Sequence, residues 1–254
     1  MRRLTLTGLP GIPEVEAGEP LARVLVEAVA RAGIELERND VLVIAQKIVS
    51  KAEGRRVLLA DIAPGARALE LAAIVGKDPR LVELMLRESK EALRAKTNVL
   101  IVEHRLGFVM ASAGIDQSNV PQRGDEACVL LLPENPDASA RRLRDALRQT
   151  CGVDVGVVIN DSFGRAWRNG VTGTAIGVAG IPALVDLRGE PDRNARPLEV
   201  TLVAAADELA AAASLVMGQR DEGVPAVHAR GFPYPPREST VQELLRPRSE
   251  DLFR

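Results

Sequence analysis

The chain has 254 residues, of which 46% are hydrophobic and 27% charged, with 33 basic side chains against 35 acidic ones. This composition is typical of a globular protein and excludes the disordered, collagen-like and disulfide-stapled classes. A formal net charge of −2 argues against a broad nucleic-acid-binding surface. The first residues meet Gly8, Pro10 and Pro13 before any apolar run, which is unlike a signal peptide, so we expect a cytoplasmic protein.

In the N-terminal half, the spacing of apolar residues predicts a helix over 20–33 and a short buried strand over 41–45. Two more helices are predicted over 64–76 and 79–96, the second beginning with a proline. Strands at 99–102 and 108–111 form a plausible hairpin, and a further strand at 129–132 ends before Pro133. The segment 134–137 contains two prolines and a helix-cap signal, so it is the expected boundary between two halves.

The C-terminal half continues with a predicted helix over 138–149 and a strand over 155–159. Residues 171–188 carry Gly173, Gly177 and Gly180 among small apolar residues, which indicates strands closely approached by another backbone. A long helix over about 199–217 ends at Gly218. Because strands and helices alternate without a strict βαβ rhythm, we expect a mixed α/β (α+β) fold rather than a doubly wound sheet.

Several common catalytic designs are missing from this sequence. The chain contains neither a P-loop nor a dinucleotide-binding glycine motif. With only His104 and His228, a zinc-protease motif is impossible and a Ser-His-Asp triad has little to draw on. Cys128 and Cys151 lack metal-ligand spacing and are expected to be small apolar residues.

Three polar stretches remain, at 112–119, 159–168 and 217–223. Asp116 and Asp161 follow strand-like runs, and acids at strand ends lie where ligands usually bind in open α/β structures. Two carboxylates with hydroxyl and amide oxygens form the donor set that Mg²⁺ or Mn²⁺ prefers, and Arg165 and Arg168 could hold phosphate oxygens beside the metal. The alternative for each stretch is a turn or helix cap.

Lys47 is one of only five lysines and follows the predicted buried strand at 41–45. A lysine at the edge of a sheet can neutralise a polyphosphate as a point charge. The alternative is an ordinary surface lysine, because this residue type is usually exposed.

Five motifs, taken in order, resemble one family closely. They are Leu9-Pro10-Gly11-Ile12-Pro13, the run from Gln46 to Gly54, the run from Ser112 to Asn119, the run from Asn160 to Arg165, and Met217-Gly218-Gln219. The chain resembles the coenzyme F420-0:L-glutamate ligases, which add γ-linked glutamate to a deazaflavin coenzyme. The resemblance runs from about residue 4 to residue 235, and it implies a single module over 1–254 in the stand-alone form, without the nitroreductase-like domain of some bacterial members.

The resemblance implies a GTP-dependent ligase that activates a carboxylate as an acyl phosphate and joins it to glutamate. It further implies two α/β subdomains with mixed sheets in an intertwined homodimer, and two Mg²⁺ or Mn²⁺ ions per site, with K⁺ as a further candidate cofactor. F420-0, and F420-1 after one addition, would be the acceptors. No membrane or nucleic-acid partner is implied.

By motif position, the resemblance also assigns roles to individual residues. Leu9, Pro10, Gly11 and Ile12 would line the GTP site, with Lys47, Asn119 and Gly218 also facing the nucleotide. Asp116 and Asp161 would hold one metal ion, Ser162 and Gln219 a second, and Arg165 would serve catalysis beside them. Two alternatives stay open: a metal- and NTP-dependent amide ligase acting on another acidic metabolite, and a non-catalytic protein that senses GTP.

Overall fold

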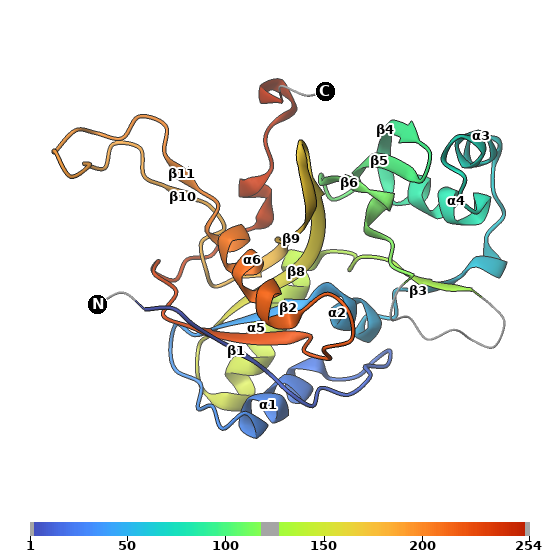
Figure 1. The fold of residues 1–254 in the computed structure, drawn as a ribbon. Coiled ribbons are helices and arrows are strands. Elements are labelled where there is room, and N and C mark those ends of the chain that lie inside the picture. The colour runs from blue at the N-terminus through green and yellow to red at the C-terminus, as the bar shows by residue number, and fades with distance from the viewer. Residues whose placement is uncertain (1–2, 118–126, 252–254) are drawn as a thin grey trace.

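A mixed five-stranded sheet forms the centre of the molecule in the computed structural model, which describes residues 3–117 and 127–251 (Figure 1). The strand order is β1-β12-β2-β8-β9, in which β2 and β8 are parallel and the other neighbours antiparallel. The strands are β1 (Thr5–Gly8), β2 (Val41–Ala45), β8 (Gly156–Arg165), β9 (Arg168–Ala179) and β12 (Ala226–Arg230). The predicted mixed α/β class is confirmed.

Helices cover both faces of this sheet, and two glycines show how closely they approach. A Cβ atom on Gly173 would lie 2.3 Å from the carbonyl oxygen of Ala210, and one on Gly177 would lie 2.5 Å from the carbonyl of Pro136. The close backbone approach predicted for these two glycines is therefore confirmed, and the helices that carry Ala210 and Pro136 pack on opposite faces of β9. At Gly180, the third glycine of that prediction, the nearest atoms belong to the side chain of Arg144 and not to a backbone. The helices packed around the main sheet are α1 (Leu21–Arg31), α2 (Gln46–Ala52), α5 (Pro136–Cys151) and α6 (Ala205–Met217).

A second, smaller lobe has a sheet and a hydrophobic core of its own (Figure 1, green to cyan). Its antiparallel sheet has the order β4-β5-β6, so the predicted hairpin of 99–102 and 108–111 is confirmed. The lobe consists of η1 (Leu59–Asp61), α3 (Ala66–Val75), α4 (Pro79–Arg87), β4 (Ser89–Lys96), β5 (Val99–His104), β6 (Val109–Ala111) and η2 (Ser112–Gly114). The strands β3 (Arg56–Leu58) and β7 (Cys128–Leu130) pair with each other where the chain enters and leaves it.

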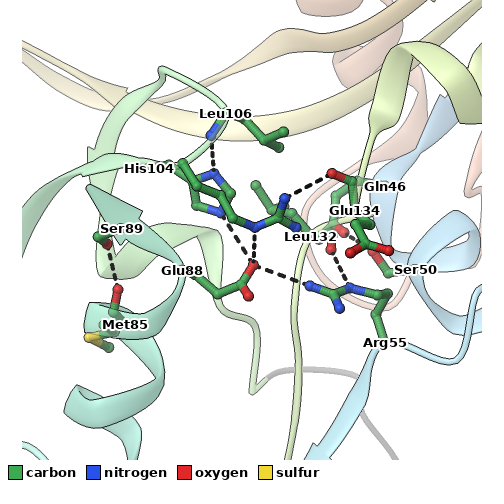
Figure 2. Close-up of polar contacts among 11 residues, drawn as sticks. Gln46, Ser50, Arg55, Met85, Glu88, Ser89, His104, Leu106, Leu132 and Glu134 are labelled. Carbon is green, nitrogen blue, oxygen red and sulfur yellow. Dashed lines mark hydrogen bonds and ion pairs between the residues drawn. The ribbon is translucent and has the colours of Figure 1, made fainter. Parts of the chain in front are cut away.

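The helix predicted over 79–96 is wrong in its second half, because the chain turns after Arg87 and continues as strand β4. Residues 89–96 include several good helix formers, but pairing with β5 overrides that local preference. Glu88, at the turn, is held by the side chains of Arg55, Arg105 and His104 (Figure 2). Arg55 lies outside the small lobe, so this cluster also joins the lobe to the strand region beside α2.

Other predicted boundaries shift by a few residues. The helix predicted from 199 begins at Ala205, because β11 (Leu202–Val203) pairs with β10 (Val185–Asp186) in a projecting arm. The strand predicted to end at Ile159 runs on to Arg165, since β9 pairs with its whole length. The C-terminal segment adds η3 (Val241–Leu244) and η4 (Arg248–Glu250). The boundary predicted at 134–137 stays a prediction; this segment precedes and begins α5.

Within the described ranges, no helix is both long and apolar enough to cross a membrane. Both histidines are buried, and each lies beside a carboxylate: Nε2 of His228 is 2.8 Å from Asp40, and Nε2 of His104 is 3.7 Å from Glu88. This agrees with structural roles for both. Cys128 is buried as expected, whereas Cys151 is only partly buried.

Candidate active site

The loops that carry the predicted site residues meet at one edge of the main sheet. Strands β1 and β2 run in the same direction because each is antiparallel to β12, and β8 is parallel to β2 with Asn160 beside Ala45. The loop after β1, the start of α2 and the loop that precedes β12 therefore lie at the edge where β2 ends. The strand β8 continues past this edge, so its residues Asp161 and Ser162 border the same region.

Asp116 is positioned at this edge by two residues from the start of α2. The side-chain amide of Gln46 donates to Oδ2 of Asp116 at 2.6 Å, and the ammonium of Lys47 lies 3.4 Å from Oδ1. The hydroxyl of Ser50, one turn further along α2, donates to Oε1 of Gln46 at 2.9 Å and fixes the amide orientation. The backbone of Asp116 is held by an antiparallel bridge to Leu130. A carboxylate is thus fixed in place by an amide and a lysine.

Asp161 is the second carboxylate of the site, and the charge of the first carboxylate acts on it. Burial, and next the negative charge of Asp116, raise the pKa of Asp161 to about 7, although the backbone N–H of Ser162 and the charge of Lys47 act in the opposite direction. Burial also raises the pKa of Asp116, against the effect of Lys47 and Gln46. Two partly buried carboxylates that repel each other favour a bound cation or a shared proton.

The donor set fits a hard divalent ion held partly by a substrate. Among the described residues, no group of three or more His, Cys, Asp or Glu side chains is placed to hold a metal. Mg²⁺ is commonly bound through one or two carboxylates plus substrate phosphates, and Asp116 with Asp161 supplies two. Oδ1 of Asn160 is also buried without a hydrogen-bond partner in the described structure, but this side chain lies on the α6 face of β8, where its Nδ2 donates to Ser214. It is therefore on the opposite face of the strand from Asp161 and is not part of the donor set of Asp116 and Asp161.

Ser162 and Gln219 form a separate pair on the other side of β8. Consecutive strand residues point to opposite faces, and Ser162 lies opposite Gly173, which faces α6. The hydroxyl of Ser162 donates to Oε1 of Gln219 at 3.0 Å. Gln219 follows Gly218, whose φ of +75° is a conformation that residues with a side chain rarely adopt. The loop shape that aims Gln219 at Ser162 therefore depends on a glycine.

The predicted GTP-site residues of the first loop lie at the same edge with different exposures. Leu9 is fully buried and its N–H donates to the carbonyl of Ala226, whereas Pro10 is exposed and Ile12 partly buried. Gly11 has a φ of +69°, and its carbonyl accepts from the guanidinium of Arg31 at 2.8 Å. Leu9 is therefore closed to a ligand in this structure, while Pro10 and Gly11 are exposed.

The described part of the structure does not bring the two remaining predicted residues, Arg165 and Asn119, into the site. Arg165 is exposed at the end of β8 and donates to the carbonyl of Asn169 at 3.3 Å. It is four residues beyond Asp161, roughly 13 Å along an extended strand, so the structure does not bring it against the two carboxylates. Asn119 lies outside the described residues. The roles predicted for both residues stay predictions.

Two polar residues of the site were not selected as site residues from the sequence. Gln46 contacts Asp116 directly, and Asn160, on the same face of β8 as Ser162, has an unpaired buried acceptor while its Nδ2 donates to Ser214. Gln46 precedes Lys47 at the end of a predicted buried strand, a position that could have drawn attention to it. For Asn160 no local signal separates this role from an ordinary buried amide.

Comparisons with known proteins identify the family of this chain. The chain matches the family model described as F420-0:Gamma-glutamyl ligase over residues 11–231. It is 47% identical over 253 residues to the coenzyme F420:L-glutamate ligase of Methanothermobacter thermautotrophicus, with 99% of each chain covered. It is 46% identical to the ligase of the same name from Methanopyrus kandleri (99% of this chain, 98% of the relative) and 42% identical to that from Methanocaldococcus jannaschii (100% and 98%). The chain therefore belongs to the F420-0:gamma-glutamyl ligase family.

Proposed function

We propose that this ligase uses GTP and a divalent cation, Mg²⁺ or Mn²⁺, to join L-glutamate to coenzyme F420-0, and to F420-1, through γ-glutamyl amide linkages in coenzyme F420 biosynthesis. The relatives named above are coenzyme F420:L-glutamate ligases, and this chain aligns with them over nearly their whole length. The observation that carries the proposal is the meeting of Asp116 and Asp161 beside Lys47 at the edge of the main sheet. Such a site suits the transfer of a phosphoryl group to a carboxylate.

The reaction needs activation, because a carboxylate does not form an amide with an amine at neutral pH. A carboxylate oxygen of the acceptor attacks the γ-phosphorus of GTP, GDP leaves, and an acyl phosphate forms. The amine of glutamate then attacks the acyl carbon, phosphate leaves, and the amine loses a proton to solvent. When bound, divalent cations supply the positive charge that offsets the repulsion between the reacting anions.

The residues of this chain position and neutralise the reactants. Asp116 and Asp161 would hold the first cation, with Ser162 and Gln219 at the second. Gln46 keeps Asp116 oriented through its 2.6 Å hydrogen bond, and Lys47, 3.4 Å from the same carboxylate, is close enough to bind a phosphate oxygen as a point charge. In this reaction no side-chain nucleophile is required, which agrees with the burial of both histidines.

The nucleotide itself would lie along the same edge, against Leu9, Pro10, Gly11 and Ile12 and beside Gly218, with Asn119 as a further contact. Arg165 would reach the phosphates only after a change of side-chain conformation or of the β8–β9 hairpin end, since it now donates to Asn169. K⁺ is a further proposed cofactor of the polyphosphate site.

We also propose that the chain forms a homodimer. The arm built from β10 and β11 extends away from the body of the protomer (Figure 1). Val200 and Leu202 on this arm are 83% and 46% exposed, respectively. Burying such apolar side chains against a second copy is the favourable alternative to leaving them in water. Light scattering should give twice the protomer mass, and Val200→Asp should lower it; a monomeric wild-type protein would contradict the proposal.

The decisive assay measures GTP consumption with product mass. We expect GDP release that depends on both glutamate and F420-0, and a product heavier by one glutamate residue. Turnover with another acidic metabolite in place of F420-0 would favour a ligase of different specificity, and GTP binding without turnover would favour a sensor.

Two variants connect this activity to the site. Asp116→Asn and Asp161→Asn should each reduce turnover by about 10³-fold or more, as expected for loss of a metal ligand worth several kcal/mol in the transition state. Asp145→Asn, an exposed carboxylate on α5, serves as the matched control. Near-normal turnover of either site variant at saturating Mn²⁺ would contradict its assignment.

A further inference from the structure

A cavity of about 220 Å³ lies between the small lobe, the start of α5 and η3, outside the residues assigned above. Its apolar wall is formed by Leu106, Phe108, Pro136, Ile176 and Val241. Polar side chains, among them Thr240 and Gln242, also line it, and the Gln242 amide donates to the carbonyl of Leu106 at 3.2 Å. This side-chain contact joins the C-terminal segment to the small lobe at the cavity.

The cavity is connected to the candidate active site through two aromatic rings. Asp161 and Phe163 are two residues apart on β8, so their side chains share one face of the sheet and lie about 7 Å apart along the strand. The ring of Phe163 packs edge-on against that of Phe108, with centroids 5.7 Å apart. Phe108 in turn lines the cavity. A ligand that reaches from Asp161 past Phe163 would therefore arrive at this cavity.

The charges around the cavity do not suit a polyanion. Arg141 lines it, but so does the buried carboxyl of Asp137, whose oxygens accept from the backbone N–H groups of Val178 and Val241. Glu243 acts on Asp137 as a further negative charge. With one guanidinium opposed by two carboxylates, a triphosphate or the two carboxylates of glutamate would gain little here.

The size and walls of the cavity suit one flat ring system. A site that encloses a whole drug-sized ligand usually has about 300–1,000 Å³, so this smaller space takes part of a ligand rather than all of it. Apolar and aromatic walls bind a flat aromatic ring well, and the amides and hydroxyl among its lining residues can bond to polar atoms at the ring edge. Of the three substrates, the deazaflavin acceptor combines such a ring with a carboxylate at the far end of a flexible chain.

We propose that this cavity binds the fused aromatic ring of the deazaflavin acceptor, while the carboxylate of the same molecule reaches the cation site at Asp161. The inference rests on the function proposed above. It adds a binding site for the ring of the acceptor, whereas the cation site at Asp161 binds only the carboxylate of that molecule. Under this arrangement Phe108 and Phe163 separate the ring from the reacting end, and the small lobe contributes to acceptor recognition.

The direct test uses the fluorescent deazaflavin riboside, which has the ring but neither phosphate nor carboxylate. Binding to the nucleotide-free protein is followed by fluorescence anisotropy. Thr240→Trp places a large side chain in the cavity, and we expect it to weaken riboside binding at least 10-fold. Thr97→Trp adds the same side chain at an exposed turn between β4 and β5, and it should bind the riboside as the wild type does.

Kinetics of the full reaction separate this inference from the proposed function. Thr240→Trp should raise the KM for F420-0 at least 10-fold and leave the KM values for GTP and glutamate unchanged. If the wild type ligates F420-0 but Thr240→Trp has an unchanged KM and riboside affinity, the ring binds elsewhere and the ligase proposal survives. If the wild type does not ligate F420-0, the ligase proposal itself is wrong.

A second variant covers the case in which Thr240→Trp does not fold, as judged by circular dichroism. Gln242→Leu removes an amide from the cavity lining without filling the cavity, and it should weaken riboside binding about three- to tenfold with GTP binding unchanged. Equal riboside affinity of this variant and the wild type, or no saturable riboside binding by the wild type, would overturn the inference.

Discussion

The side-chain amide of Gln46 donates a 2.6 Å hydrogen bond to Oδ2 of Asp116, and this contact joins residues 70 positions apart in the chain. It ties the start of α2, at the edge of the main sheet, to the segment that leaves the small lobe. The geometry of the candidate cation site therefore depends on how the lobe is seated on the sheet. Gln46 acts through Asp116 and is a positioning residue.

Gln46→Leu should lower kcat/KM by about 10- to 100-fold, because a hydrogen bond to a charged group contributes about 1.5–3 kcal/mol. Gln46→Glu should be worse, since it places a second carboxylate against Asp116. In both variants the Mn²⁺ concentration for half-maximal rate should change, which a merely structural role would not produce. Gln149→Leu, on the exposed side of α5, is the control. Wild-type metal dependence in Gln46→Leu would show that Asp116 does not need this amide.

The sequence predicted three of the five strands of the main sheet, β2, β8 and β9, from their runs of apolar or small residues, whereas β1 and β12 were not predicted. The strand at 41–45 appears with the expected bounds, and the helix expected over 20–33 appears as α1 with its predicted apolar face largely buried. The segment 89–96 was mispredicted since its composition favours a helix, and only the partner strand β5 makes it a strand. Long-range pairing of this kind leaves no local pattern in the sequence.

The positions of the candidate site residues could be predicted only in part, and their roles stay predictions. Asp116, Asp161 and Lys47 were selected from strand ends and motifs, and the structure brings them together. The position of Arg165 could not be predicted in the same way, because it depends on how far β8 extends before the chain turns. The hydrogen bond of Gln46 depends on the seating of the small lobe, which no local pattern describes.

The burial of Asp161 and its repulsion by Asp116 predict that the metal-free protein becomes less stable as the pH rises. Burial and the charge of Asp116 raise the pKa of Asp161 to about 7, above its ordinary 3.8. The folded state therefore disfavours the charged form, and the cost grows from about pH 4 and is complete above about pH 7. Asp161→Asn removes this cost and should raise Tm at pH 8 but not at pH 4, by an amount corresponding to a few kcal/mol.

The same Tm measurement in the presence of Mn²⁺ tests whether the two carboxylates bind a cation. The cation should raise the Tm of the wild type at pH 8 and have a much smaller effect on Asp161→Asn, because only the wild type offers two charged ligands. Asp145→Asn should follow the wild type in both conditions. A variant with the same Tm as the wild type at pH 8 without metal would contradict the electrostatic account.

The buried cluster around Glu88 predicts an acid-sensitive junction between the lobe and the rest of the molecule (Figure 2). Burial alone would raise the pKa of Glu88, but His104, Arg105 and Arg55 outweigh it and lower that pKa to about 2. Nδ1 of His104 accepts from the backbone N–H of Leu106, so its Nε2 carries the proton toward Glu88.

Because the pKa of Glu88 is lowered from 4.5, its charge stabilises the fold fully above about pH 4.5, and this stabilisation is lost as the pH falls toward 2. Glu88→Gln should lower the free energy of unfolding at pH 7 by on the order of 3 kcal/mol. The difference from the wild type should shrink between pH 5 and pH 3 in urea titrations. Glu190→Gln, an exposed carboxylate on the arm, should show neither effect; a pH-independent loss in Glu88→Gln would instead indicate a packing role.

Variants of Gln219 test whether a second cation binds on the α6 side of β8. Its Oε1 accepts from the hydroxyl of Ser162 at 3.0 Å, so the two oxygens that would bind a second ion already lie side by side. Hard cations respond to the charge of their ligands, and an amide contributes a neutral oxygen. Gln219→Glu should therefore lower the Mn²⁺ concentration needed for half-maximal rate, whereas Gln219→Ala should raise it. At high Mn²⁺, Gln219→Ala should keep some activity, unlike Asp161→Asn. Gln149→Glu, an equivalent change on the exposed side of α5, controls for added charge. If both Gln219 variants keep the wild-type Mn²⁺ dependence, Gln219 only shapes the loop after Gly218, and the second ion must take its protein ligands from elsewhere.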